Sequence, residues 1–101
     1  MTSSRSDVQI PLARNVRVTD DTLAVDLEDG RTLTAPLAWY PRLAHGAAAE
    51  RQHWELIGRG EGIHWPDLDE DISMANLLDG KPSGESQRSF ARWLEGRKST
   101  G

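Results

Sequence analysis

Hydrophobic and polar residues alternate through the first third of the chain, which is the pattern of half-buried β-strands. Valine alternates with polar residues over 15–19, and leucine and valine alternate with smaller or polar residues over 23–27. A third alternating run ends at Pro36, because proline cannot donate a hydrogen bond to a neighbouring strand. Asp20-Asp21 suits a turn between the first two runs. The pattern therefore predicts a three-stranded antiparallel meander.

The turn between the second and third strands contains Glu28-Asp29-Gly30-Arg31, which is a strong hairpin signal. A two-residue turn at Asp29-Gly30 would place the apolar residues of the two strands on opposite faces. A three-residue loop, with Gly30 in the left-handed conformation, sets Val25 opposite Leu33 instead. Because one face of the sheet must be buried, we predict the three-residue loop with a glycine bulge.

The middle of the chain predicts a bend, a short helical region and a second hairpin. Pro41 disfavours helical angles at the residue before it, so 37–40 form a bend and a helix begins near Pro41. Residues 47–52 (AAAERQ) have high helix propensity. Residues 54–56 and 63–65 predict two short strands, joined by a tight turn through the glycines between them.

Residues 67–79 predict a helix directly after this hairpin. Asp67 is suited to cap its first turn, and Glu70 completes a capping box. The apolar stripe of this helix consists of Ile72, Ala75 and Leu78. A glycine at 80 and a proline at 82 end it.

A last helix is predicted over 87–94, and Gly96 is expected to end it. Its apolar face consists of Phe90, Trp93 and Leu94, and its charged edge of Arg88 and Arg92. A helix of about two turns is too short to persist alone in water. Its aromatic face therefore docks either on its own domain or on a partner, and both alternatives stay open.

These elements together predict an α+β fold: an N-terminal three-stranded antiparallel meander, a second short hairpin, and two to three short helices. A chain of 101 residues forms one domain, with a small core because only 37% of the residues are hydrophobic. We expect 1–12 to be a flexible N-terminal arm and 13–83 a single α+β domain. We expect 84–101 to form a short basic C-terminal helix and tail.

Charge is distributed unevenly, although the net charge is only −4. The stretch 60–80 has six acidic residues and no lysine or arginine, whereas 86–101 has four basic residues against one acid. An acidic body with a basic tail argues against a duplex-binding surface over the whole protein. The absence of cysteine fits a reducing cytoplasm. No apolar run reaches the roughly 20 residues that a membrane span needs, so we expect no membrane association.

The acidic stretch after His64 invites a metal-site interpretation, which its spacing does not support. Aspartates alternate as in a calcium-binding loop, but Ile72 and Leu78 stand where such a loop needs glycine and glutamate. His64 and Asp67 would supply only two ligands, fewer than a zinc site requires. The glycine-rich segment 58–62 is followed by a strand and not by the helix that a phosphate-binding loop needs. We therefore predict no metal, no cofactor and no catalytic residue.

The segments VTDDTLAVDLEDGRTLTAPLAWYPRL and ERQHWELIGRGEGIHWPDLDEDISMANLLDGKPS closely resemble the bacterial family called domain of unknown function 2442. The resemblance runs from about Ala13 to Ser83, and its most specific parts are 36–43 and 62–72. One departure is 44–47, where the family more often has a Thr-Pro-like helix start. The resemblance implies a small α+β domain without a known active site, so no catalytic residue carries over.

Some members of that family carry a helix-turn-helix DNA-binding domain after this module. Others are short stand-alone chains encoded beside another small uncharacterised protein, an arrangement similar to that of toxin–antitoxin pairs. Here about 18 residues follow Ser83, too few for a helix-turn-helix domain. DNA binding through such a domain therefore does not carry over.

We expect a cytoplasmic, non-enzymatic protein-interaction module, the antitoxin-like or regulatory member of a small bacterial two-gene pair, whose partner is a small protein encoded nearby. The expected partner-binding residues are Trp39, Tyr40, Arg42, Arg88, Phe90, Arg92, Trp93 and Arg97. The alternative is a nucleic-acid-associated regulator that uses the basic C-terminal tail. A third interpretation, an enzyme centred on His64, has no further support in the sequence.

Overall fold

The computed structural model describes residues 10–100, with side chains as far as Arg97. The predicted arm over 1–12 lies mostly outside these residues, and so does the side chain of Lys98. The described chain forms two three-stranded antiparallel sheets, with strand orders β1-β2-β3 and β4-β5-β6. The strands are β1 Ala13–Val18, β2 Thr22–Leu27, β3 Thr32–Pro36, β4 Glu55–Ile57, β5 Gly62–Trp65 and β6 Glu70–Ser73. The predicted α+β class is confirmed.

Short helices connect these strands. They are the 3-10 helix η2 Leu37–Trp39, α1 Pro41–His45, α2 Ala48–Gln52 and α3 Met74–Leu78, followed by the longer α4 Gln87–Thr100. The bend and the helix start at Pro41 are confirmed, and Pro41 occupies the first turn of α1, where proline is favoured. Within the described residues, no helix has both the length and the apolar character needed to cross a membrane.

The first sheet has the predicted register. Val25 lies opposite Leu33, and Leu23 opposite Ala35. The Leu27 N–H donates to the Arg31 carbonyl at 2.8 Å, and Gly30 has a φ of +95°. The glycine-bulge hairpin is therefore confirmed.

Substitutions at Gly30 test this loop directly. No atom lies within 4 Å of the position that a Cβ would take, so only backbone strain opposes a side chain. We expect Gly30→Val to lower the free energy of unfolding by about 1–2 kcal/mol, and Gly30→Asn by distinctly less, because asparagine tolerates positive φ. Urea denaturation of both variants measures the difference; equal losses would contradict the assigned loop conformation.

The second hairpin is confirmed, but the predicted helix over 67–79 is wrong. Residues 66–69 form a turn, Glu70–Ser73 form strand β6 beside β5, and only Met74–Leu78 are helical. Asp69 adopts a positive φ of 52° in that turn, which aspartate tolerates better than most residues. Pairing with β5 sets Ile72 opposite the buried Ile63, so tertiary pairing overrides the local helix propensity.

The capping box predicted at the start of that helix is also absent. Ser73 caps α3 in its place, with its side chain accepting a hydrogen bond from the Asn76 N–H at 3.1 Å. In the predicted stripe, Leu78 is 36% exposed, whereas Met74 and Leu77 are buried. The helical face was therefore displaced as well as shortened.

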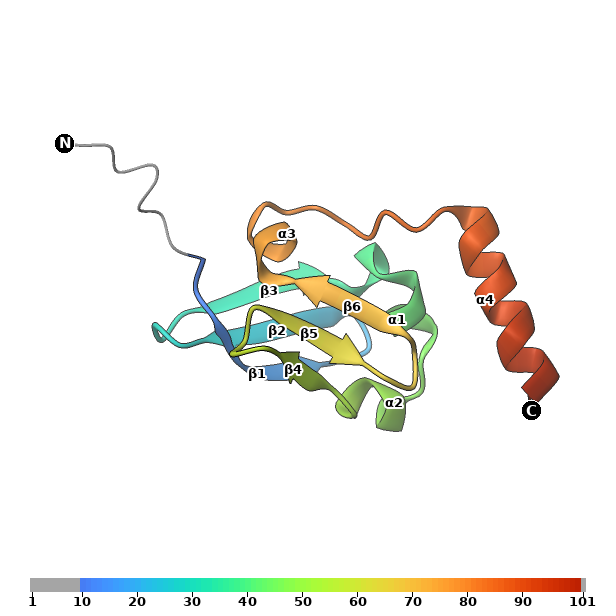
Figure 1. Ribbon diagram of the computed structural model, residues 1–101, viewed down its shortest axis with the longest axis horizontal. Helices are drawn as coiled ribbons and strands as arrows, with labels where there is room; N and C mark the ends of the chain where they lie inside the picture. The colour runs from blue at the N-terminus through green and yellow to red at the C-terminus, as the bar shows by residue number, and fades with distance from the viewer. Residues whose placement is uncertain (1–9, 101) are drawn as a thin grey trace.

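The two sheets lie face to face and enclose one core (Figure 1). Leucines and valines of β2 contribute from the first sheet, and Ile63, Trp65 and Ile72 from the second. Trp65 is fully buried, and its Nε1 donates to the Arg51 carbonyl at 3.1 Å, which satisfies the one polar atom of its ring.

A backbone contact also joins the sheets at the β4–β5 turn. The Ala13 N–H of β1 donates to the Gly60 carbonyl at 2.8 Å. Gly60 is buried and has a φ of +110°. A Cβ on Gly60 would lie 2.4 Å from the Ala13 carbonyl oxygen, so the two backbones approach too closely for a side chain.

An extended segment after α3 leads to α4, which lies beside α1 and α2 at one end of the sheets (Figure 1). Trp93 of α4 packs against the core. The prediction that Gly96 ends this helix is wrong, because α4 continues to Thr100. Arg97 binds Glu50 of α2, and this contact holds the turn that follows the glycine.

Candidate functional site

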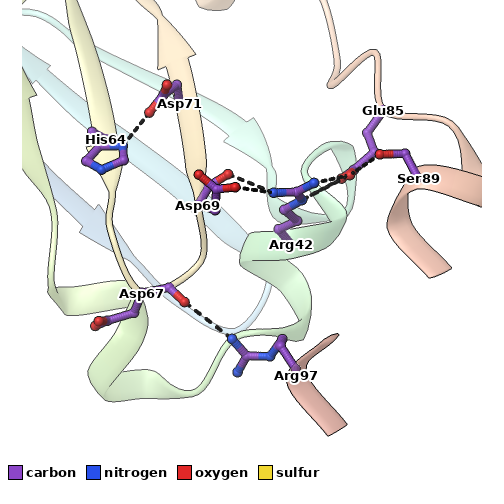
Figure 2. Close-up of polar contacts among 8 residues, drawn as sticks. All are labelled: Arg42, His64, Asp67, Asp69, Asp71, Glu85, Ser89 and Arg97. Carbon is purple, nitrogen blue, oxygen red and sulfur yellow. Dashed lines mark hydrogen bonds and ion pairs between the residues drawn. The ribbon is translucent and has the colours of Figure 1, made fainter. Parts of the chain in front are cut away.

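Arg42 of α1 is the centre of the polar contacts between the body and the C-terminal segment (Figure 2). Its Nε donates to the two carboxylate oxygens of Glu85 at 2.9 and 3.0 Å, and its Nη1 to the Asp69 carbonyl at 2.8 Å. Glu85 also accepts a hydrogen bond from Ser89 Oγ at 2.9 Å. The hydrogen bonds from Arg42 are the main reason that the pKa of Glu85 lies below its usual value. The first turn of α4 is therefore fixed to α1.

Trp93 lies near two guanidinium groups. The Arg42 Cζ is 5.1 Å from the ring centroid, and the Arg97 Cζ is 4.8 Å from it. Both distances lie within the range of a cation–π interaction, which contributes roughly 0.5–2 kcal/mol depending on solvation. Trp93 is thereby held by one residue of the body and one of its own helix.

His45, at the end of α1, adds an aromatic contact. Its ring meets Phe90 and Trp93 edge-on, with centroid distances of 6.3 and 5.8 Å. Phe90 and Trp93 stack on each other at 5.7 Å. The apolar face predicted for the last helix therefore docks on the protein's own body.

A second ion pair secures the far end of α4. Arg97 Nη2 donates to the Glu50 carboxylate at 2.8 and 3.0 Å, and Arg97 Nη1 to the Asp67 carbonyl at 3.4 Å. Glu50 also accepts from the Ala47 N–H at 2.9 Å. That backbone hydrogen bond, followed by the one from Arg97, holds the pKa of Glu50 below its usual value.

Glu70 is a carboxyl group on the inward face of a sheet. It pairs with Trp65 across β5 and β6, so its side chain leaves the sheet on the same face as Trp65 and Ile72. Burial is the main reason that the pKa of Glu70 rises to about 7, although nearby Arg42 acts in the opposite direction. The Arg42 guanidinium is itself bound to Glu85 and Asp69, which leaves Glu70 without a direct ion pair among the described residues.

Tyr40 is the second unusual polar group of this region. Its side chain is 2% exposed, and its hydroxyl has no hydrogen-bond partner within the described part of the chain. Tyr40 and Glu70 both line a cavity of about 120 Å³ between β6, α3 and the 81–84 segment. Burial, and secondly the charge of Glu70, raise the pKa of Tyr40.

His64, in β5 between the buried Ile63 and Trp65, lies on the outer face of the second sheet, and His53 lies at the end of α2, just before β4. His64 is bound to Asp71 of β6 (Figure 2). On the neighbouring strand β4, Glu55 lies opposite His64. The hydrogen bond to Asp71 is the main cause of a raised His64 pKa. His53 Nδ1 is 2.8 Å from Asp67 Oδ2. In the described residues, no three metal-ligating side chains gather at one point.

The residues expected to bind a partner occupy three environments. Those in the contacts between α4 and the body are Arg42, Phe90, Trp93 and Arg97. Tyr40 is buried, and Trp39 is half-buried against the core. Arg88 and Arg92 are exposed on α4, and neither has an ion pair within residues 10–97.

Apart from Arg42, sequence reasoning missed the polar residues that meet α4 and its preceding segment. His45, Glu50 and Glu85 were not singled out, and no local signal indicates that Glu85, which precedes α4, contacts Ser89 and Arg42. Glu70 was assigned to a helix cap, and no local signal indicates that it faces inward. Its orientation depends on the pairing of β6 with β5.

Comparisons with known proteins agree with this fold. A protein of unknown function from Rhodospirillum rubrum is 29% identical, with a TM-score of 0.65 over 76% of this chain and 95% of that chain. An uncharacterized protein from Chromobacterium violaceum, 20% identical, shares the fold with a TM-score of 0.63 over 88% of this chain and 79% of that chain. No curated protein matches the chain.

The family model described as "Protein of unknown function (DUF2442)" matches residues 13–83, which hold both sheets and helices η2 to α3. Helix α4 lies outside the matched range. The chain therefore belongs to the family of domain of unknown function 2442.

Proposed function

We propose that the protein is a non-enzymatic protein-interaction module that presents the outer face of α4 to a partner protein. The partner would be a small protein encoded nearby, and this chain the antitoxin-like or regulatory member of the pair. A cytoplasmic location is part of the proposal; without cysteine, the fold does not depend on an oxidising compartment.

The observation that carries the proposal is the pair Arg88 and Arg92. They lie four residues apart on a helix, so they share one face, and both are exposed. The opposite side of α4 is fixed by Arg42, Glu50 and their ion pairs. A docked helix presents its outer side chains in a defined geometry, which lowers the entropy lost when a partner binds. Carboxylates on the partner would suit these two arginines.

Charge reversal on this face tests the proposal better than removal of the helix. Because Phe90 and Trp93 pack on the body, deleting α4 would change stability and binding together. We expect Arg88→Glu/Arg92→Glu to keep the fold, because neither side chain has an ion pair to lose within residues 10–97. Binding to the partner should weaken at least tenfold, since repulsion replaces two charge-assisted contacts.

The experiment needs an identified partner and a matched control. Affinity capture from the native host identifies the partner, and calorimetry with the purified pair then measures Kd. Arg14→Glu/Arg59→Glu changes the net charge equally at two exposed positions away from α4, and should leave Kd within about threefold. Equal weakening by the two double variants would refute a specific role for α4.

The nucleic-acid alternative uses the same two arginines and makes a different prediction. Contacts to phosphate would weaken steeply with salt for a random duplex as well as for any specific site. Fluorescence anisotropy with a labelled duplex at two salt concentrations measures this dependence. Affinity for DNA that is lost in Arg88→Glu/Arg92→Glu, without any protein partner, would favour the alternative.

A further inference from the structure

The cavity between β6, α3 and the 81–84 segment combines a confined space with two polar groups that lack partners. Glu70 enters it from the inward face of β6, and Tyr40 lines it from the start of α1. The Tyr40 hydroxyl is buried without a hydrogen bond within the described part of the chain. Leaving such a hydroxyl unpaired costs roughly 1–3 kcal/mol, so a ligand that pairs with it gains that energy.

The charges around the cavity indicate the sign of the ligand. Glu70 and Asp71 line it, and Asp69 and Glu85 lie close enough to Glu70 to raise its pKa. The two cations nearby are both engaged, because Arg42 binds Glu85 at 2.5 Å and Lys81 lies 3.8 Å from Asp79. A bound cation would therefore be attracted by Glu70 without competing against a resident ion pair.

The size of the cavity limits the ligand to a small group. Its volume is about 120 Å³. That is roughly four times the share of one water molecule in the liquid. An ammonium group on one or two carbons fits this volume, and its N–H groups can donate to the Glu70 carboxylate and to the Tyr40 oxygen.

We propose that the cavity lined by Glu70 and Tyr40 is a binding site for a small primary ammonium group, with the Glu70 carboxylate as its counter-ion and the Tyr40 hydroxyl as a second acceptor. The 81–84 segment forms the outer wall, and the Ser83 N–H donates to the Trp39 carbonyl at 3.0 Å. Because the Tyr40 hydroxyl is buried in this structure, its contact with a ligand requires an outward movement of that wall. This site is independent of the outer face of α4.

Binding should depend on pH in a defined direction, because an ammonium group pairs with ionised Glu70 only. The pKa of Glu70 in the empty cavity is about 7, so most molecules carry the charge at pH 8 and few at pH 5.5. The groups that face Glu70 are Arg42 on α1, Glu85 before α4, and Asp69 and Asp71 beside it. We expect the apparent affinity to fall about 30-fold from pH 8 to pH 5.5.

Titration of the full chain with methylammonium chloride, followed by two-dimensional amide NMR at constant ionic strength, tests the site. We expect saturable shifts at residues of the cavity wall, and none with tetramethylammonium, which has no N–H donor. Glu70→Gln should weaken binding at least tenfold, and Tyr40→Phe about fivefold, since the first removes a charged acceptor and the second a neutral one.

A control variant and two outcomes decide the result. Glu28→Gln removes a carboxyl from the exposed hairpin loop of the first sheet and should bind methylammonium as the unaltered protein does. The amide spectrum of each variant shows directly that it is folded. Shifts that do not saturate would mean that the cavity holds water only, and unchanged affinity in Glu70→Gln would place the cation elsewhere; either result overturns the proposal.

Discussion

Replacing Gly60 with alanine is expected to lower the free energy of unfolding by about 3 kcal/mol, the largest loss that we predict for a single methyl group in this protein. Two effects add. The φ of +110° is unfavourable for any residue with a Cβ, and the new Cβ would lie 2.4 Å from the Ala13 carbonyl oxygen. Neither backbone can move without loosening the Ala13–Gly60 hydrogen bond that joins the two sheets.

Gly30→Ala provides the matched control for this experiment. Gly30 has a similar φ of +95° in a hairpin loop, but a Cβ there has no neighbour within 4 Å. We expect Gly30→Ala to cost about 1 kcal/mol, which isolates the backbone strain. Thermal unfolding should show a fall in Tm of roughly 12 °C or more for Gly60→Ala, and of a few degrees for Gly30→Ala. Equal losses would mean that the contact with Ala13 contributes nothing.

Glu70→Gln is expected to stabilise the protein at pH 8 and to leave its stability nearly unchanged at pH 4. The folded protein holds the pKa of Glu70 at about 7, above its ordinary 4.5. Below pH 4.5 the Glu70 carboxyl is neutral in both the folded and the unfolded chain, so it does not destabilise the fold. As the pH rises from 4.5 to 7, it ionises more readily in the unfolded chain, and the folded state loses stability relative to the unfolded state. Glutamine keeps the shape of the side chain and never ionises.

The size of this effect follows from the shift in pKa. A change of the Glu70 pKa from 4.5 to about 7 corresponds to a loss of roughly 3 kcal/mol in the free energy of unfolding at a pH above 7, if solvent does not screen the charge. Because the carboxyl keeps some contact with solvent, we expect about 2 kcal/mol. Urea denaturation of both proteins between pH 4 and pH 8 measures the difference, which should grow between pH 4.5 and 7 and stay constant above.

Asp26→Asn supplies a comparison of opposite sign. Hydrogen bonds from Arg17 and Thr32 hold the pKa of Asp26 below its usual value. That carboxylate therefore favours the folded state at neutral pH, and this contribution is lost as the pH falls. Asp26→Asn should destabilise the protein at pH 8 and matter less at low pH. A stability difference for Glu70→Gln that does not change with pH would show that Glu70 titrates normally.

The first sheet could be predicted from the sequence because its determinants are local. Alternating residues identify the strands, and the position of Gly30 selects the loop that sets Val25 opposite Leu33. The same holds for the start of α1 at Pro41 and for the β4–β5 hairpin. In each case the relevant residues lie within about ten positions of each other, so their spacing alone fixes the geometry.

Strand β6 could not be predicted in this way, because its own residues favour a different structure. Asp67 and Glu70 have the spacing of a capping box, and a local rule assigns them to a helix. The strand forms because Ile72 gains a buried neighbour in Ile63 and the backbone gains a ladder with β5. Those energies depend on residues outside the segment.

The candidate sites show the same division between local pattern and tertiary contact. The sequence by itself determined the α+β class, the first sheet, and the aromatic face of the last helix with its two arginines. Only the tertiary structure decided that this face packs on His45, that Arg42 meets Glu85 across 43 positions, and that Glu70 points inward beside Tyr40. Local propensities are small energies that act between near neighbours, whereas burial and ion pairing depend on which distant segments the fold brings together.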